Sequence, residues 1–362
     1  MPETEQKKVS FFRNKAFWKG LLDYLVKTTN GMAFGLFATL IIGVIITQIG
    51  SLLDFDIQLF GWIINIGNNI MGLGTVLKGL MGVGIGIGVA WSMDLKGLRL
   101  ICAGAVGGIA GSTIIGAKAD PLVIYITVVA TVNLVGLILK KKTSVDIILI
   151  PLLFSIIGFL IALIIYTPVY SVTTAVGLFI NNATTYAPFF MGIAISVAMG
   201  IALTLPISSA AIAIAFNISG LAGGAAVVGC CAQMVGFAVQ GRKDNPIGTT
   251  LATGIGTSMI QFKNILKKPI IWLPTIIASA ILGPLATMVF KTQCVATGAG
   301  MGTSGLVGQF GTYSSMSAAG SSQLQIWLSI GLLEIVLPIA LVWLLDFIFR
   351  KFKLYGLGDF KI

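Results

Sequence analysis

The chain has 362 residues, of which 56% are hydrophobic and only 10% are charged. A soluble domain carries about 25% charged residues, so this composition excludes an ordinary soluble domain and indicates an integral membrane protein. The net charge of +11 does not indicate a nucleic-acid partner, because the basic residues stand in short runs between apolar segments, as the positive-inside rule expects.

The sequence offers little for catalysis. It contains no histidine, which excludes a histidine base, a histidine metal ligand and a phosphohistidine on this chain. Its four cysteines stand in or beside apolar segments without zinc or redox spacing, so we interpret them as buried small side chains (Cys102, Cys230, Cys231 and Cys294). We therefore expect no catalytic residue, no metal and no cofactor.

Residues 1–30 are predicted to be a cytoplasmic amphipathic segment. A helix over residues 9–27 would place apolar side chains on one face, while the basic side chains reach lipid headgroups (Phe11, Trp18, Leu22 and Leu25). Six basic residues before the first span place the N-terminus in the cytoplasm. This segment is too charged for a cleavable signal peptide.

The first half of the chain, residues 31–167, contains a series of predicted membrane spans. These are residues 31–50, one span plus a glycine-rich piece within 57–93, and residues 100–117, 122–139 and 145–167. Asp54 and Asp56 stand in a short acidic loop after the first span, whereas Lys140–Lys142 mark a cytoplasmic turn. Turn and capping positions are expected for the other acidic residues of this half, including Asp94 and Asp120.

Glycines recur in this half at spacings that favour close helix packing. Gly31 and Gly35 form one such pair, and the segment 100–117 carries overlapping small-residue pairs. Within residues 57–93, glycines alternate (Gly82, Gly84, Gly86 and Gly88), which indicates either tight helix contact or a broken helix.

Residues 168–187 are rich in threonine and asparagine and are predicted to be an amphipathic connector. The second half, residues 188–349, has spans at 188–205, 271–290 and 323–349. The block 206–239 is long for one span and short for two, so a hairpin is one interpretation, and 247–262 is too polar to face lipid. Basic residues follow the last span, so we expect 350–362 to be a cytoplasmic tail.

The stretch 296–312, ATGAGMGTSGLVGQFGT, is uncharged and contains six glycines, so it is a poor continuous helix. Non-helical backbone at bilayer depth persists only where protein or a water-filled cavity covers it. We therefore predict a re-entrant, broken-helix segment whose backbone and hydroxyl groups face a polar ligand. Its candidate binding residues are Gly300, Gly302, Thr303, Ser304 and Gln309.

Glu334 is an acidic residue near the middle of the last span, and no basic residue lies within ten positions of it. A carboxyl group at this depth costs a few kcal/mol on insertion scales and should face the protein interior. Pro338 removes the backbone hydrogen bond to the Glu334 carbonyl, which favours a kink there. Two interpretations stay open, namely a structural carboxyl bonded to a neighbouring helix and a hydroxyl-binding or proton-linked group.

A second set of uncharged polar residues lies upstream, and each member can bind sugar hydroxyls or satisfy interhelical hydrogen bonds (Asn245, Thr257, Ser258 and Gln261). The tripeptide Gly256-Thr257-Ser258 recurs as Gly302-Thr303-Ser304, either by chance or as a trace of two related broken helices. Asp346 differs from Glu334, because Arg350 is one helical turn away and predicts a local ion pair.

The run KKPIIWLPTIIASAILGPLATMVF, the following GAGMGTSGLVGQFGT and the upstream NPIGTTLATGIGTSMIQ resemble the EIIC-type membrane proteins of the sugar phosphotransferase system. Within that family the chain is most similar to the stand-alone branch that includes the perfringolysin regulator. The resemblance covers nearly all residues after 30 and is most specific from 241 to 322.

This resemblance implies an all-α fold of about ten transmembrane helices with re-entrant hairpins and an elevator-type movement. It also implies a homodimer in the bacterial plasma membrane, with residues 31–167 as the scaffold half and 188–349 as the substrate half. The loop 300–309 and Glu334 fall where the substrate site of the family is expected. Neither an EIIA nor an EIIB domain is recognisable in the chain, so EIIA and EIIB would act as separate partners. The sequence also lacks the histidine and the Asn-Glu-Pro-like carboxylate of many sugar-specific members.

Three functions follow from these observations. The first is a permease that moves a sugar or a related polar solute inward, with phosphorylation by EIIA and EIIB in trans. The second is a membrane sensor or regulator that keeps the transporter fold without flux. The third is a carrier of a non-sugar solute, since free backbone N–H groups at helix ends can bind anions.

Overall fold

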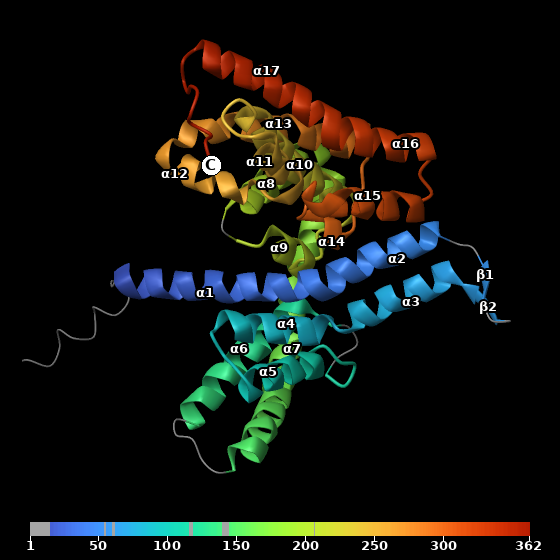
Figure 1. Ribbon diagram of the computed structural model, residues 1–362, viewed down its shortest axis with the longest axis vertical. Helices are drawn as coiled ribbons and strands as arrows, with labels where there is room; N and C mark the ends of the chain where they lie inside the picture. Colours follow the sequence, from blue (N-terminus) through green and yellow to red (C-terminus); the bar gives the residue numbers. More distant parts are fainter. Residues whose placement is uncertain (1–14, 54–55, 60–61, 116–118, 140–144, 206) are drawn as a thin grey trace, which may run out of the picture.

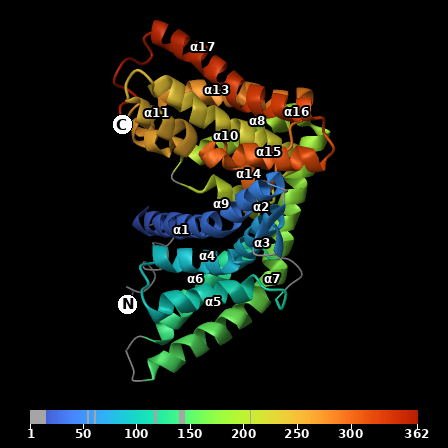
Figure 2. The same cartoon turned by 45° about the vertical axis from the view of Figure 1, so that its right-hand side comes forward.

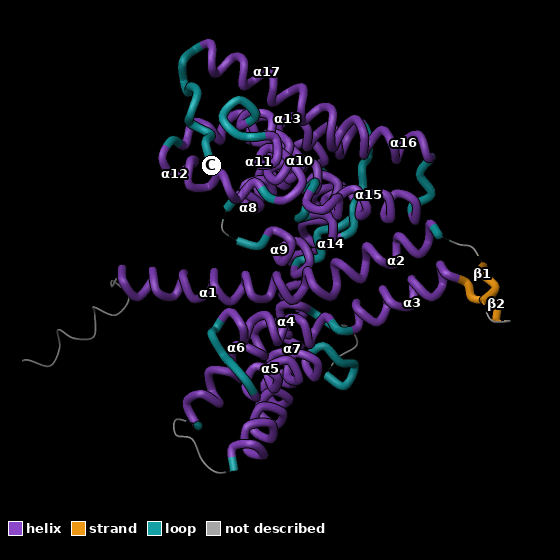
Figure 3. Tube along the Cα trace, viewed as in Figure 1, coloured by secondary structure: helices purple, strands orange, loops and turns teal. Residues whose placement is uncertain are grey.

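The computed structural model describes residues 15–53, 56–59, 62–115, 119–139, 145–205 and 207–362. Helices form nearly all of it, in agreement with the predicted all-α fold. The exception among the described residues is one antiparallel hairpin of strands β1 (Asp56–Leu59) and β2 (Trp62–Asn65), shown in orange in Figure 3. The predicted acidic loop is therefore wrong at Asp56, which begins a strand, while Asp54 lies outside the described residues.

The N-terminal half consists of six helices and a connecting π-helical turn. These are α1 (Lys15–Leu36), the π-helical turn Phe37–Ile41, α2 (Ile42–Leu52), α3 (Ile66–Gly79), α4 (Met81–Ser92), α5 (Leu98–Ala110) and α6 (Pro121–Ile138). The chain stays helical from α1 through α2, so the predicted interfacial helix and the first predicted span are one run, without a break near residue 30. Phe11 and the side chains of Trp18 and Leu22 lie outside the described residues, as do Lys140–Lys142.

Glycine contacts bring α4 against α1 on one side and α5 on the other. A Cβ atom added to Gly35 would lie 2.1 Å from the Gly84 carbonyl oxygen, and one added to Gly107 would lie 2.1 Å from the Gly82 carbonyl oxygen. Only glycine permits backbones to approach this closely. The alternating glycines therefore mediate tight helix contact within the unbroken α4, and the bend of 50° in this block falls before them, between α3 and α4.

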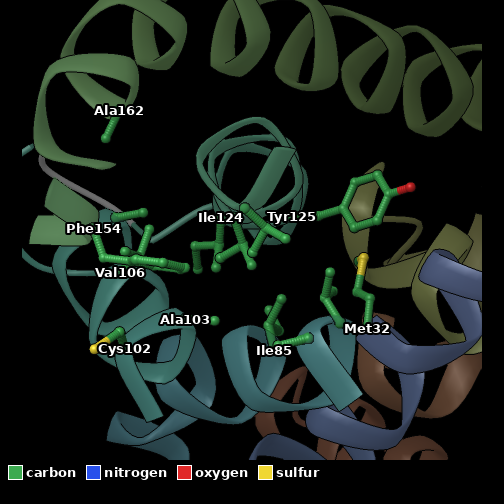
Figure 4. Close-up of a cluster of buried hydrophobic side chains, with 14 of the residues drawn as sticks. Met32, Ile85, Cys102, Ala103, Val106, Ile124, Tyr125, Phe154 and Ala162 are labelled. Atoms are coloured by element: carbon green, nitrogen blue, oxygen red, sulfur yellow. The ribbon is translucent and has the colours of Figure 1, made fainter. Parts of the chain in front are cut away.

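The core of the N-terminal half lies between α1, α4, α5, α6 and α7, and Figure 4 shows part of it. Ile85, Val106 and Phe154 are among its fully buried side chains. Asp120 is the N-cap of α6, where its carboxylate accepts hydrogen bonds from the backbone N–H groups of Leu122 and Val123, as the sequence predicts. The other oxygen of Asp120 accepts the Thr173 hydroxyl of α7 at 2.8 Å.

Helix α7 (Asp146–Tyr186) joins the two halves of the molecule. It is 41 residues long, so at 1.5 Å per residue it extends about 60 Å, twice the thickness of a bilayer core. It packs on α5 and α6 at one end and on α8 and α10 at the other, and Figure 2 shows it running between the two groups of helices. Within the predicted connector, residues 168–186 are thus the C-terminal part of this continuous helix, and Ala187 is its C-cap.

The C-terminal half stacks above α1 and α2 in Figure 1 and contains short and interrupted helices around the central helix α10. Its α-helices are α8 (Pro188–Thr204), α9 (Ser209–Ala215), α10 (Gly220–Gly241), α11 (Ile247–Leu251), α12 (Phe262–Lys267), α13 (Leu273–Pro284), α14 (Ala296–Ala299), α15 (Val307–Ala318), α16 (Gln323–Trp327) and α17 (Leu337–Lys351). Its π-helical segments are Ala252–Gly256, Leu285–Val289 and Leu328–Val336, and its 3-10 turns are Ser258–Gln261, Pro269–Trp272 and Ser304–Leu306. The block 206–239 contains the short α9 and most of the long α10, which is buried along most of its length.

Six helical runs among the described residues are long and apolar enough to cross a membrane, or up to seven if the bent pair α3–α4 counts as one span. The chain is thus a multi-pass membrane protein, whereas the predicted number of ten spans is not confirmed. Part of the difference comes from α5 and α8, which are apolar but have only 13 and 17 residues. A full crossing needs about 20 residues.

The C-terminal hook, which we define as residues 352–362, folds back onto the C-terminal half instead of extending away from it. Phe360 has no exposed surface and Tyr355 is buried, and both pack with Phe237 and Ile271. The predicted ion pair between Asp346 and Arg350 is confirmed, with Arg350 Nε 2.9 Å from Asp346 Oδ1. Tyr355 donates its hydroxyl to the same Asp346 oxygen at 3.0 Å, so this pair also anchors the hook.

Candidate functional site

The segment 296–312 is a broken helix, as its glycines predict. Helix α14 ends after one turn, the 3-10 turn Ser304–Leu306 follows, and α15 begins at Val307. Gly302 and Gly305 have φ angles of +54°, a conformation that glycine adopts at little cost, and Leu306 at +59° continues the left-handed turn. The chain therefore changes direction between α14 and α15, with Gly300 and Gly302 buried and Gly305 and Leu306 exposed.

This turn is held in place by its contact with the backbones of neighbouring helices. The Ser209 hydroxyl of α9 donates to the Gly300 carbonyl oxygen at 2.6 Å. A Cβ atom added to Gly302 would lie 2.8 Å from the carbonyl carbon of Cys230, so the turn rests directly on α10. The Gly308 N–H group donates to the Gly302 carbonyl oxygen at 3.0 Å and closes the turn onto α15.

The turn also contacts the other copy of the repeated tripeptide. Thr303 donates its hydroxyl to the Gly254 carbonyl oxygen, and Ser304 donates to the Gly256 carbonyl oxygen at 2.9 Å. Two interrupted segments, Ala252–Gly256 and Ser304–Leu306, thus lie against each other. The Thr303 and Ser304 hydroxyl protons are used in this contact, and their oxygens remain able to accept hydrogen bonds from a ligand.

Glu334 lies in the middle of the π-helical segment Leu328–Val336 and has no exposed surface. Its carboxyl group accepts the Gln309 side-chain N–H at 2.9 Å and the Thr312 hydroxyl at 2.6 Å. The ion pairs among the described residues do not include Glu334, so both of its hydrogen-bond partners are neutral. The π-helical segment ends just before Pro338, where the sequence predicts a kink, and such segments are frequent at functional sites.

The contact between Glu334 and α15 shows a carboxyl group bonded to a neighbouring helix, and the hydroxyl-binding or proton-linked role stays a prediction. A carboxylate has about four acceptor positions, and only two of them are used by Gln309 and Thr312. The group is therefore bonded to a neighbouring helix and still has capacity for hydroxyl donors. Because neither donor is charged, a ligand hydroxyl can replace one of them without separating an ion pair.

Gln309 connects this buried carboxyl to a cavity of about 330 Å³. The side chain lines the cavity together with the rings of Phe310, Tyr313 and Trp327, and the Tyr313 and Trp327 ring centroids are 6.0 Å apart. The Gln309 carbonyl oxygen Oε1 is buried without a hydrogen-bond partner in the described part of the chain. A mostly apolar cavity with few polar groups is the usual form of a small-molecule site.

A second polar cluster lies on the other side of α10. The Ser258 and Thr204 hydroxyl oxygens are 2.9 Å apart. Gln233 accepts hydrogen bonds from the Trp272 indole at 2.9 Å and from the Thr275 hydroxyl at 2.8 Å. Thr257 caps the following 3-10 turn through the Met259 N–H group. Among the sequence candidates, Ser258 therefore belongs to an interhelical network.

Asn245 and Gln261 lie at the hook and not at Glu334. Both donate their side-chain amides to the Phe360 carbonyl oxygen, at 2.8 Å and 3.0 Å, and Asn245 also accepts the Ile362 N–H group at 2.9 Å. The broken-helix segment thus holds Gly300, Gly302, Thr303, Ser304 and Gln309, and Gln309 joins it to Glu334, whereas Asn245 and Gln261 lie apart from it at the hook. Among the described residues, the hydrogen bonds of these two amides go to the C-terminal hook and to the adjoining Gly241 and Asn264.

Sequence reasoning did not single out Thr312 as a partner of Glu334. The signal was present, because Thr312 ends the broken-helix segment and lies three residues after Gln309, on the same face of a helix. The contact of Cys231 with Gln309, at 3.4 Å between Sγ and Nε2, had no signal, since the sequence indicates only that this cysteine is buried.

These features define a polytopic helical membrane protein with a buried carboxyl group and two interrupted helices inside one half of the molecule. The family model described as "Phosphotransferase system, EIIC" matches residues 26–362, which is nearly the whole chain. The protein therefore belongs to the EIIC family and is a membrane component of the phosphotransferase system. Comparison with curated proteins and with solved structures found no match.

Proposed function

We propose that the protein is a permease that binds a sugar or a related polar solute at Glu334 and carries it across the bacterial plasma membrane. The observation that carries this proposal is the buried Glu334 carboxyl group, which is bonded only to the neutral side chains of Gln309 and Thr312 from the broken-helix segment. Membership of the EIIC family supports a sugar as the solute class.

Binding would use the groups that the turn and its surroundings present. The Glu334 carboxyl group accepts a sugar hydroxyl, and the unpaired Gln309 oxygen accepts another. The Tyr313 and Trp327 rings offer an apolar surface to the C–H face of a sugar ring in the adjoining cavity. Gly300, Gly302, Thr303 and Ser304 keep the turn close to α10 and, in this proposal, contribute backbone and hydroxyl contacts to the solute.

Phosphorylation of the solute would need separate proteins. The sequence has no histidine, and the four cysteines are buried, so this chain offers no accessible group of the kind that carries a phosphoryl group in such systems. We therefore propose that EIIA and EIIB partners act in trans. We also propose that the protein is related to the perfringolysin-regulator branch of the family. In this proposal its N- and C-termini lie in the cytoplasm, and it forms a homodimer in the membrane.

The movement that we propose is an elevator-type displacement of residues 188–349 against a scaffold formed by residues 31–167. The main hydrophobic clusters support it, because each lies mostly within one half, and the small cluster of Ile41, Ala210, Met301 and Val307 marks the surface where the halves would slide. Helix α7 joins the halves and contacts both. Of the two other candidate functions, neither is favoured by a specific contact in the structure.

The test is the melting temperature of the purified, detergent-solubilised protein against a panel of sugars, sugar phosphates and nucleobases. A ligand that binds the folded state raises this temperature by mass action. We expect a shift with one sugar class that is lost in Glu334→Gln and kept in Asp120→Asn. Asp120 is the matched control, because its carboxyl group is also buried and also accepts a threonine hydroxyl, but it lies in the other half. A shift that persists in Glu334→Gln would refute the proposed site.

A further inference from the structure

The C-terminal end of α17, which is far from Glu334, and the turn after α10 form a basic surface. Arg242 and Lys243 follow the last residue of α10, and Arg350 and Lys351 end α17. These four cations line one open cavity of about 370 Å³. A neighbouring cavity of about 400 Å³ shares Lys243 and Arg350 and adds Lys268 and Lys353.

The acidic residues nearby neutralise only part of this charge. Asp346 is almost fully buried and bonds Arg350 through both oxygens, at 2.9 Å and 3.1 Å, while Arg242 lies 3.8 Å from it. Asp359 is paired with Lys268 at 2.7 Å. Within the described part of the chain, the ion pairs do not include Lys243 or Lys351, and both side chains are exposed. The cavity wall therefore carries four cations against one anion, Asp346, and keeps a net positive charge.

The same cavity has an aromatic side that continues into the exposed apolar face of α17. Trp343 and Phe347 line the cavity, are 52% and 57% exposed, and stack with ring centroids 6.5 Å apart. Ile339, one turn earlier, is exposed on the same helical face, and Lys351 follows one turn after Phe347. Helix α17 lies at the outer edge of the C-terminal half in Figures 1 and 2.

The side chains are basic at the helix end, aromatic one to two turns inward and aliphatic beyond. This order matches the cross-section of a phospholipid leaflet. Tryptophan and tyrosine mark the headgroup level in membrane proteins, and basic pockets beside transmembrane helices bind anionic headgroups. We propose that an anionic phospholipid binds here, with its phosphate against Arg242, Lys243 and Lys351 and an acyl chain along Phe347, Trp343 and Ile339. The site is independent of the solute site at Glu334.

The test is native mass spectrometry of the full-length protein, released from micelles that contain equal amounts of phosphatidylglycerol and phosphatidylcholine with the same acyl chains. We expect preferential retention of phosphatidylglycerol. In the double variant Lys243→Gln/Lys351→Gln, the affinity for phosphatidylglycerol should fall about five-fold for each charge removed, and so about twenty-five-fold in all. Both side chains are exposed, so the variant should fold like the wild type.

The matched control is Lys263→Gln/Lys267→Gln on α12, which removes the same charge from exposed positions outside the cavity. It should retain phosphatidylglycerol like the wild type. Equal retention of the two lipids, or an equal loss in both double variants, would overturn the proposal. Displacement of the lipid by millimolar inorganic phosphate would also overturn it, because that result would make the cavity a site for free phosphate.

Discussion

Gly302 is the position at which the broken-helix segment touches the backbone of α10, and Gly302→Ala tests this contact. The φ angle of +54° costs a residue with a Cβ atom about 1–2 kcal/mol. The new Cβ atom would also lie 2.8 Å from the Cys230 carbonyl carbon and 2.9 Å from the Cys231 nitrogen, and such overpacking costs about 1–3 kcal/mol. We therefore expect a loss of about 2–5 kcal/mol in the free energy of unfolding.

Gly305→Ala separates the two contributions. Gly305 has the same φ angle of +54°, but the nearest atom to its added Cβ would be Val307 Cγ2 at 3.8 Å, an ordinary contact. Only the conformational cost of about 1–2 kcal/mol should remain. The free energy of unfolding of each variant can be measured by titration with sodium dodecyl sulfate in mixed micelles, followed by far-UV circular dichroism. Equal losses in the two variants would show that the segment does not rest on α10.

Further expectations concern the hook and the polar cluster beside α10. Phe360→Ala removes a side chain with no exposed surface, so it should lower the free energy of unfolding by about 3–5 kcal/mol and expose the hook to limited proteolysis. The control is Leu357→Ala, which should change the free energy of unfolding by less than about 0.5 kcal/mol because this side chain is 75% exposed. The hydrogen bond from Lys268 holds the pKa of Asp359 below its usual value of 3.8. Because the pKa is lowered in the folded state, the stabilisation by this pair is complete above about pH 5 and is lost as the pH falls through the lowered pKa. Protection of the hook from protease should therefore decrease below about pH 4. The decrease should be smaller in Asp359→Asn. Gln233→Leu removes the acceptor of the half-buried Trp272 indole N–H, while the Thr275 hydroxyl keeps the Trp272 carbonyl oxygen as acceptor, and it should cost about 1–3 kcal/mol in the same unfolding titration; an unchanged value would show that water or another acceptor replaces the glutamine.

The glycine patterns predicted much of the fold because a glycine acts through the absence of a side chain, which is visible in the sequence. Gly31, Gly35 and the alternating glycines of α4 lie at helix contacts, and Gly300, Gly302 and Gly305 lie where the helix of 296–312 is interrupted. The continuity of α7 was not predicted, because Pro168 and the threonines and asparagines after it have a low helix propensity and mark a separate amphipathic connector. Its packing against α8 and α10 overrides that local preference.

The candidate site was predictable where its residues share one segment of the sequence, or where a single acidic residue lies in an otherwise apolar segment. Gln309 and the turn lie within 17 residues, and Glu334 is conspicuous as an acidic residue in the last span. Asn245 and Gln261 differ, because their partners lie about 100 residues further along the chain, in the hook. A short polar residue near a membrane span has the same signature whether it binds a solute or a distant backbone carbonyl.

The central claim is that the Glu334 carboxyl group binds the solute, and the most direct test is equilibrium binding of the radiolabelled sugar identified in the melting panel. A hydrogen bond to a charged or strongly polar partner contributes about 1.5–3 kcal/mol, so Glu334→Gln should weaken binding roughly 10- to 150-fold. Asp120→Asn should bind as the wild type does, because Asp120 lies outside the C-terminal half. Wild-type affinity in Glu334→Gln, measured on folded protein, would contradict the account.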